Sequence, residues 1–323
     1  MVKERVLGFD LGRIVAIFVV IGIYHNFGYA KVHHYRDAAT LSLVYSSLGL
    51  FTFISAFLLS SKYSLTNKKE IIQFYKKRVV RIWPLFELSS FALYFIHFNE
   101  LFPTLKGLVG LSPFWKPAPT TMWYVAMLIT LYVLTPFVVQ GSVVKQCLKV
   151  VLVMTLIGAI QIVFKTVVPK TFNYYTVYMI GLLLGRNASK ATMSFLSSKK
   201  TIFVSGGWLI LYVIVCLTGN NWLKSLSGVI GIVAFINLCI LISNVFSTRH
   251  RFVNIITTLS YSTFCAYLFH REVIWLLLRI KALERGWPVF LEVLLIGVPL
   301  TFMVAYIVQH LYDSFTNRLI YKK

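Results

Sequence analysis

Two histidines lie within long apolar segments of the sequence, where an ionisable side chain is costly to place. His25 lies twelve residues after Arg13 in the first apolar segment, which is about 18 Å along a helix that rises 1.5 Å per residue. His270 lies near the middle of a later segment and is followed by Arg271. Imidazole can take or give a proton near neutral pH, so His25 is a candidate general base. Either histidine could instead be structural, bonded within a buried polar network.

A pair of arginines lies where a basic stretch enters the third apolar segment. Arg78 and Arg81 are three residues apart, so they share one face if this segment is helical. Pro84 fits a helix start or a kink. Planar guanidinium groups suit phosphate or carboxylate ligands. The alternative is a stop-transfer cluster that contacts anionic lipid.

The elements that must position these residues are membrane-spanning helices. Of the 323 residues, 58% are hydrophobic and only 13% are charged, and the mean hydropathy is +0.76. A water-soluble domain is closer to half apolar and a quarter charged. The apolar segments are near helix-spanning length and lack the alternation of barrel strands, so we predict an all-α, polytopic integral membrane protein.

About ten transmembrane helices are predicted, with the fifth and sixth separated only by Pro169–Thr171. The expected spans are Leu11–Phe27, Leu41–Ser60, Ile82–Phe98, Met122–Val139, Leu148–Val168, Phe172–Gly185, Ile202–Leu217, Leu226–Phe246, Leu259–Ile280 and Val289–Leu311. If the N-terminus is cytoplasmic, 20 basic residues fall on the cytoplasmic side and nine on the opposite side. The positive-inside rule therefore places both termini in the cytoplasm.

The formal net charge of +22 first suggests a nucleic-acid partner. The basic residues occupy short loops between apolar segments, so we interpret them as a topology signal with affinity for membrane lipids, and we expect no nucleic-acid partner. The four cysteines show no metal-ligand spacing, and no metal is expected. No separate soluble domain is visible, and residues 1–323 are interpreted as a single transmembrane domain.

Five motifs in chain order resemble those of the membrane acyltransferase type 3 family, whose ten-span members move acyl groups from acyl-CoA to surface glycans and related acceptors. The matching positions are Arg13 and His25; Phe51–Leu59 with Ser55; Arg78, Arg81, Ile82 and Pro84; Trp123, Tyr132, Leu134 and Pro136; and Ser260, Tyr261, Tyr267, Leu268 and His270. In this chain Ala56 replaces the usual glycine of the second motif, and a histidine often found just before Trp123 is absent.

The resemblance implies a membrane acyltransferase that moves an acyl group, acetyl in the expected case, from cytoplasmic acyl-CoA to a hydroxyl of a cell-surface polysaccharide or glycolipid. His25 and Arg13 would be catalytic, and Arg78 and Arg81 would bind acyl-CoA. The positioning candidates are Glu87, Trp123, Tyr132, His270 and Ser55. The expected location is the plasma or inner membrane, and other glycan-assembly proteins are expected partners. The alternative is an exporter or flippase for surface polysaccharide.

One departure from the family pattern concerns the spacing of Arg13 and His25. The family has ten residues between the two, and this chain has eleven. On an ideal helix the family step returns to within about 20° of the same face, whereas the step here ends about 120° away. Either a π-type bulge near Gly22 restores the shared face, or one of the two residues does not serve the family role.

Overall fold

The structure is a computed structural model that describes residues 5–32, 34–112, 114, 118–163, 169–281 and 286–320. Within these residues all regular secondary structure is helical, and no strand is present. The helices, in order, are α1 (Leu7–Phe18), η1 (Val19–His25), α2 (Asn26–Ala30), α3 (Ala38–Lys62), α4 (Lys68–Phe95), α5 (Leu101–Leu108), α6 (Trp123–Val139), α7 (Val143–Val163), α8 (Pro169–Asn187), α9 (Ser189–Ser197), η2 (Lys199–Thr201), α10 (Ile202–Thr218), α11 (Asn221–Phe246), α12 (His250–Lys281), α13 (Trp287–Glu292), η3 (Val293–Gly297) and α14 (Val298–Ile320). The all-α prediction is confirmed for this part of the chain.

Seven of the described helical segments are long and apolar enough to cross a membrane. They are Leu7–Ala30, Ala38–Lys62, Val143–Val163, Lys199–Thr218, Trp222–Phe246, His250–Ile280 and Trp287–Asn317. The other three predicted spans fall on α4, α6 and α8. The first half of α4 is strongly basic, and α6 has only 17 residues. The count of ten and the orientation of the termini stay predictions, and residues 164–168 of the fifth predicted span lie outside the described residues.

The chain divides into two compact units that share helix α3. One unit comprises Thr52–Thr192, and the other comprises Glu4–Phe51 with Met193–Lys323. We call them the Arg78 unit and the His25 unit after the candidate residues that they contain. The prediction that residues 1–323 form one domain stays a prediction.

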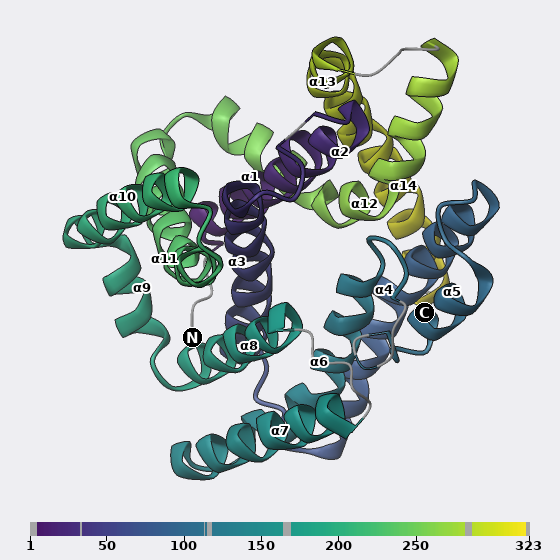
Figure 1. The fold of residues 1–323 in the computed structure, drawn as a ribbon. Coiled ribbons are helices and arrows are strands. Elements are labelled where there is room, and N and C mark those ends of the chain that lie inside the picture. Colours follow the sequence, from purple (N-terminus) through teal and green to yellow (C-terminus); the bar gives the residue numbers. More distant parts are fainter. Residues whose placement is uncertain are drawn as a thin grey trace. The chain divides into compact units, whose positions relative to one another are not determined.

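In the His25 unit, α1 packs against both α11 and α12, and α12 runs beside α14, while α10 pairs with α11 (Figure 1). The contact of α1 with α11 is close because Gly8 has no side chain. A β-carbon at Gly8 would lie 2.7 Å from the Cα atom of Ile240. This packing places the first span directly beside α12, the helix that carries His270.

In the Arg78 unit, α6 packs against both α7 and α8, and α4 packs against α6. Helix α8 approaches α3 closely through two glycines. A β-carbon at Gly185 would lie 2.4 Å from the carbonyl oxygen of Phe57, and one at Gly181 would lie 2.8 Å from the β-carbon of Ala56. The alanine that replaces the usual glycine of the second motif is therefore matched by a glycine on the facing helix.

Helix α4 starts earlier than the predicted third span. Asn67 caps it by accepting a hydrogen bond from the backbone N–H of Glu70 at 2.9 Å, and the Glu70 carboxylate accepts bonds from Ser64 (2.6 Å) and the Thr66 N–H (3.1 Å). This reciprocal capping begins the helix at Lys68, well before the apolar stretch. Pro84 lies inside α4 and not at its start.

Candidate functional site

The extra residue between Arg13 and His25 is accommodated by a π-helix. Element η1 spans Val19–His25 and includes Gly22, which is the place where the spacing predicted a bulge. A π turn closes with one more residue than an α turn. The structure therefore has the π turn near Gly22 that the first of the two alternatives required, and the family role of Arg13 stays a prediction.

A second π-helix, η3, lies in the last span and packs against η1. Asn26 joins the two regions from a fully buried position. Its Nδ2 donates to the carbonyl oxygen of Gly22 at 3.2 Å and to that of Phe290, just before η3, at 2.8 Å. Asn26, the residue that follows His25, thus links the first span to the last span.

His25 lies against α12, where it meets both His270 and Arg271. The guanidinium Nη2 of Arg271 lies 3.0 Å from Nδ1 of His25. Arginine only donates hydrogen bonds, so Nδ1 of His25 accepts this one. Arg271 is 8% exposed, and its guanidinium lies 5.9 Å from the centre of the Tyr29 ring.

The ring of His270 stacks on that of His25, with the centroids 5.0 Å apart and the planes inclined by 28°. Its Nδ1 lies 2.8 Å from the carbonyl oxygen of Tyr267, one turn earlier on α12. The side chain is fully buried, and its Nε2 has no hydrogen-bond partner among the described residues. The structure thus brings together two histidines that the sequence singled out separately.

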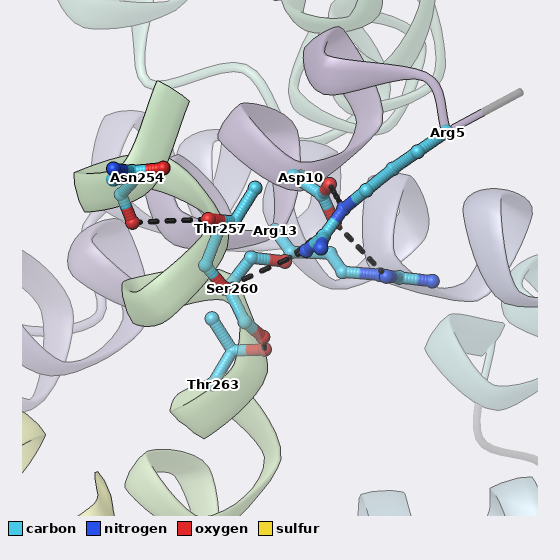
Figure 2. Close-up of polar contacts among 7 residues, drawn as sticks. All are labelled: Arg5, Asp10, Arg13, Asn254, Thr257, Ser260 and Thr263. Atoms are coloured by element: carbon cyan, nitrogen blue, oxygen red, sulfur yellow. Dashed lines mark hydrogen bonds and ion pairs between the residues drawn. The ribbon is translucent and has the colours of Figure 1, made fainter. Parts of the chain in front are cut away.

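Arg13 takes part in a different cluster, at the other end of α1. The Asp10 carboxylate is paired with Arg5 at 2.5 Å and with Arg13 at 3.5 Å, and it accepts a hydrogen bond from Ser260 of α12 at 2.7 Å. Figure 2 shows Arg5 reaching past this carboxylate toward the carbonyl of Thr257, 3.5 Å away. The cluster fixes α1 to α12 but lies about 18 Å along the helix from His25.

Arg78 occupies an aromatic cage in the Arg78 unit. Its guanidinium carbon lies 5.9 Å from the ring centre of Tyr63, 5.6 Å from that of Phe74 and 5.8 Å from that of Tyr132. These distances fall within the range of cation–π attraction. The Nε atom of Arg78 is buried without a hydrogen-bond partner in the described part of the chain. The rings therefore stabilise the positive charge of Arg78 without occupying any of its N–H donors.

Arg81 lies on the same helix and is exposed. The two arginines do lie three apart on one helix, as the motif required, but only Arg78 is enclosed. Glu87, one of the positioning candidates, accepts a hydrogen bond from the indole Nε1 of Trp83 at 2.6 Å.

The remaining positioning candidates also lie in the Arg78 unit. Trp123 is half-buried against the ring of Tyr174, with centroids 6.1 Å apart. Tyr132 forms part of the cage and also meets the Tyr178 ring at 6.2 Å. Ser55 lies half-buried on α3.

Two residues of the site were missed by sequence reasoning. Arg271 was noted only as the residue after His270, and Asn26 was not singled out. The available signal for Asn26 was an amide next to His25 within an otherwise apolar span. Among the described residues, no group of three or more histidine, cysteine, aspartate or glutamate side chains is placed to hold a metal ion.

Comparison with known proteins gives one match. A family model described as an acyltransferase domain, of the acyltransferase type 3 class, matches residues 6–310, which is nearly the whole chain. No curated protein and no solved structure matches the chain.

Proposed function

The chain belongs to the acyltransferase type 3 family, and we propose that it transfers an acyl group, acetyl in the expected case, from cytoplasmic acyl-CoA to a hydroxyl of a surface polysaccharide or related envelope acceptor. It is a multi-pass membrane protein, with seven helical segments able to span a bilayer. The proposed location is the plasma or inner membrane, with both termini in the cytoplasm.

The observation that carries this proposal is the stacked pair of His25 and His270 with Arg271 bonded to it. Acyl transfer to a hydroxyl requires removal of a proton and stabilisation of the charge that develops on the carbonyl oxygen. Two imidazoles and a guanidinium within hydrogen-bonding or stacking distance supply groups for both tasks. The burial of His270 and Arg271 supports such a role because electrostatic stabilisation is stronger where water is excluded.

The proposed donor site is the aromatic cage of Arg78 with Arg81 beside it on α4. Acyl-CoA is rich in phosphate, and guanidinium groups bind phosphate with paired N–H donors. The cage supports this role because the rings leave the donors of Arg78 available to a ligand. Five lysines between Lys62 and Lys77 add further positive charge to this part of the chain. The proposed reaction requires no metal.

The proposal is tested with the purified protein in detergent, where transport cannot register. Acetyl-CoA consumption is measured with and without an acceptor glycan. We expect turnover by the wild-type protein and its loss in His25→Ala, with the variant still inserted and folded. An exporter or flippase would consume no acetyl-CoA, and that result would reject the proposal. Chemical comparison of surface glycans from cells with and without the protein then identifies the acyl group and the acceptor.

A further inference from the structure

The two stacked histidines make hydrogen bonds that demand opposite proton positions. Nδ1 of His25 faces the guanidinium of Arg271 at 3.0 Å. A guanidinium has no lone pair to offer, so Nδ1 carries the lone pair and, in the neutral ring, the proton lies on Nε2. The free edge of His25 is therefore a hydrogen-bond donor.

His270 has the reverse arrangement. Its Nδ1 faces the backbone carbonyl oxygen of Tyr267 at 2.8 Å. A carbonyl oxygen only accepts, so Nδ1 carries the proton and Nε2 carries the lone pair. A ring oriented through Nδ1–H by a carbonyl or carboxylate, with Nε2 left to take a proton, is the arrangement of a histidine general base.

We infer that the two rings divide the work of the transfer: Nε2 of His270 takes the proton of the acceptor hydroxyl, and the Nε2–H of His25 donates to the oxyanion. This inference rests on the proposed acyltransferase function and assigns its base to the late histidine. The sequence-based expectation gave that task to His25.

Two buried polar atoms near Arg271 support a polar ligand at this place. Nε2 of His270 and the hydroxyl of Tyr29, whose ring centre lies 5.9 Å from the guanidinium, are buried without a hydrogen-bond partner in the residues that the structure describes. A buried polar group without a partner is destabilising, and native proteins contain few of them. Both atoms lack a partner near one guanidinium, and this is explained if a polar substrate group binds to them.

The proposed transfer forms a C–O bond and breaks a C–S bond. The acceptor O–H gives its proton to Nε2 of His270 while its oxygen forms a bond to the thioester carbonyl carbon. The carbonyl oxygen becomes an oxyanion that accepts a hydrogen bond from Nε2–H of His25, with Arg271 behind that ring. The intermediate collapses, the C–S bond breaks, and the leaving CoA sulfur takes the proton from His270. The products are the acylated acceptor and free CoA.

The experiment compares His270→Asn, His25→Gln and His25→Ala as purified full-length proteins, with acetyl-CoA and the acceptor glycan. In His270→Asn the new side-chain amide keeps a donor for the Tyr267 carbonyl but has no basic atom. In His25→Gln the new side-chain amide can accept from Arg271 and still donate a hydrogen bond. Thermal unfolding in detergent reports whether each variant is folded.

We expect His270→Asn to lower kcat on the order of 10²–10⁴-fold with KM for acetyl-CoA unchanged, since a general base contributes that much. We expect His25→Ala to lower kcat on the order of 10²–10³-fold, as for loss of one oxyanion donor. His25→Gln should recover activity to within about tenfold of wild type, because the donor is restored.

A pH profile separates the base from a merely structural histidine. The titratable and charged groups around His270 are His25, Arg271 and Tyr267. In the wild-type protein the rate should stop rising with pH once the base has lost its proton. In His270→Asn the residual rate should keep rising, because only hydroxide remains to take the proton.

The outcomes distinguish the two proposals. If the wild-type protein turns over acetyl-CoA but folded His270→Asn keeps its kcat, the division of roles is rejected and the acyltransferase function stands. If His25→Gln is as inactive as His25→Ala, the donor role of His25 is rejected. If the wild-type protein itself shows no turnover, the proposed function is rejected.

Discussion

The Arg78 and His25 units each enclose an arginine, and they do so in different ways. Three aromatic rings surround the guanidinium of Arg78, so its charge is stabilised without the use of its N–H donors. Arg271 instead directs a donor at the ring nitrogen of His25 and thereby determines which atom of that ring carries the proton. The first arrangement suits binding of an anion, and the second suits control of a proton. Substitutions in the two places should therefore change different kinetic constants.

Among the substitutions that compare the two arginines and their units, the largest expected effect is that of Arg271→Ala. It removes the donor to Nδ1 of His25, so the proton of that ring is no longer confined to Nε2 and the charge behind the oxyanion is lost. We expect kcat to fall on the order of 10²–10³-fold, with KM for acyl-CoA nearly unchanged. Arg279→Ala is the matched control, because Arg279 is exposed on the same helix and lies over the Trp275 ring at 4.7 Å. Equal losses in both variants would contradict the assignment.

The next effect is that of Arg78→Ala, which should raise KM for acyl-CoA by about 10–100-fold and change kcat little, since a charge-assisted phosphate contact contributes roughly 1.5–3 kcal/mol. High donor concentration should restore the rate. Arg78→Lys should recover only part of the loss, because lysine lacks the planar fork. Lys77→Ala, at an exposed neighbour on α4, is the control. A fall in kcat at saturating acyl-CoA would show that Arg78 acts in the transfer step and not only in donor binding. The two arginines would then not differ in the way proposed.

A smaller effect is expected for Asn26→Ala, which leaves the carbonyl oxygens of Gly22 and Phe290 without their side-chain donor. Each lost buried hydrogen bond should cost about 1–3 kcal/mol of folding free energy. We expect a lower unfolding temperature and a modest fall in kcat, measured on protein in detergent. Asn254→Ala, at an exposed position on α12, should change neither. Unchanged stability of Asn26→Ala would mean that η1 does not depend on this residue.

The smallest effect concerns the start of α4. Hydrogen bonds from Ser64 and from the Thr66 N–H lower the pKa of the Glu70 carboxyl below its ordinary value. A lowered pKa stabilises the folded state above the ordinary value of about 4.3, and this contribution disappears as the pH falls through the folded-state pKa. Glu70→Gln should therefore speed amide hydrogen exchange in the first turn of α4 at pH 7 by a few-fold. Its KM for acyl-CoA should change less than twofold, and a large change would link the cap to the cage.

Much of the fold could be predicted because the apolar segments are long. Each predicted span falls mainly on helix over its described residues, and η1 was one of two alternatives derived from a single extra residue between Arg13 and His25. Single residues such as His270 could also be identified from the sequence. An imidazole within an apolar segment is unusual because burying an ionisable side chain there costs free energy.

The contacts between helices could not be predicted. The sequence shows that Arg271 needs a partner, but several groups could serve, and only the packing of α1 on α12 selects His25. The role of Asn26 depends on π turns in two spans at opposite ends of the chain. The cage of Arg78 likewise needs Tyr63 and Tyr132, which lie far apart in sequence. Such pairings follow from tertiary packing and leave no local pattern.

The bond from Asn26 to Phe290 has a consequence for biosynthesis. The first span leaves the ribosome early, whereas Phe290 is made near the end of translation. During most of synthesis the turn that carries His25 therefore lacks its hydrogen-bonded contact with the last span. Only when the final span enters the bilayer can the two π turns meet. A nascent or truncated chain would thus have the proposed acyl-CoA site without the proposed reaction centre, and we expect that it would not hydrolyse the thioester.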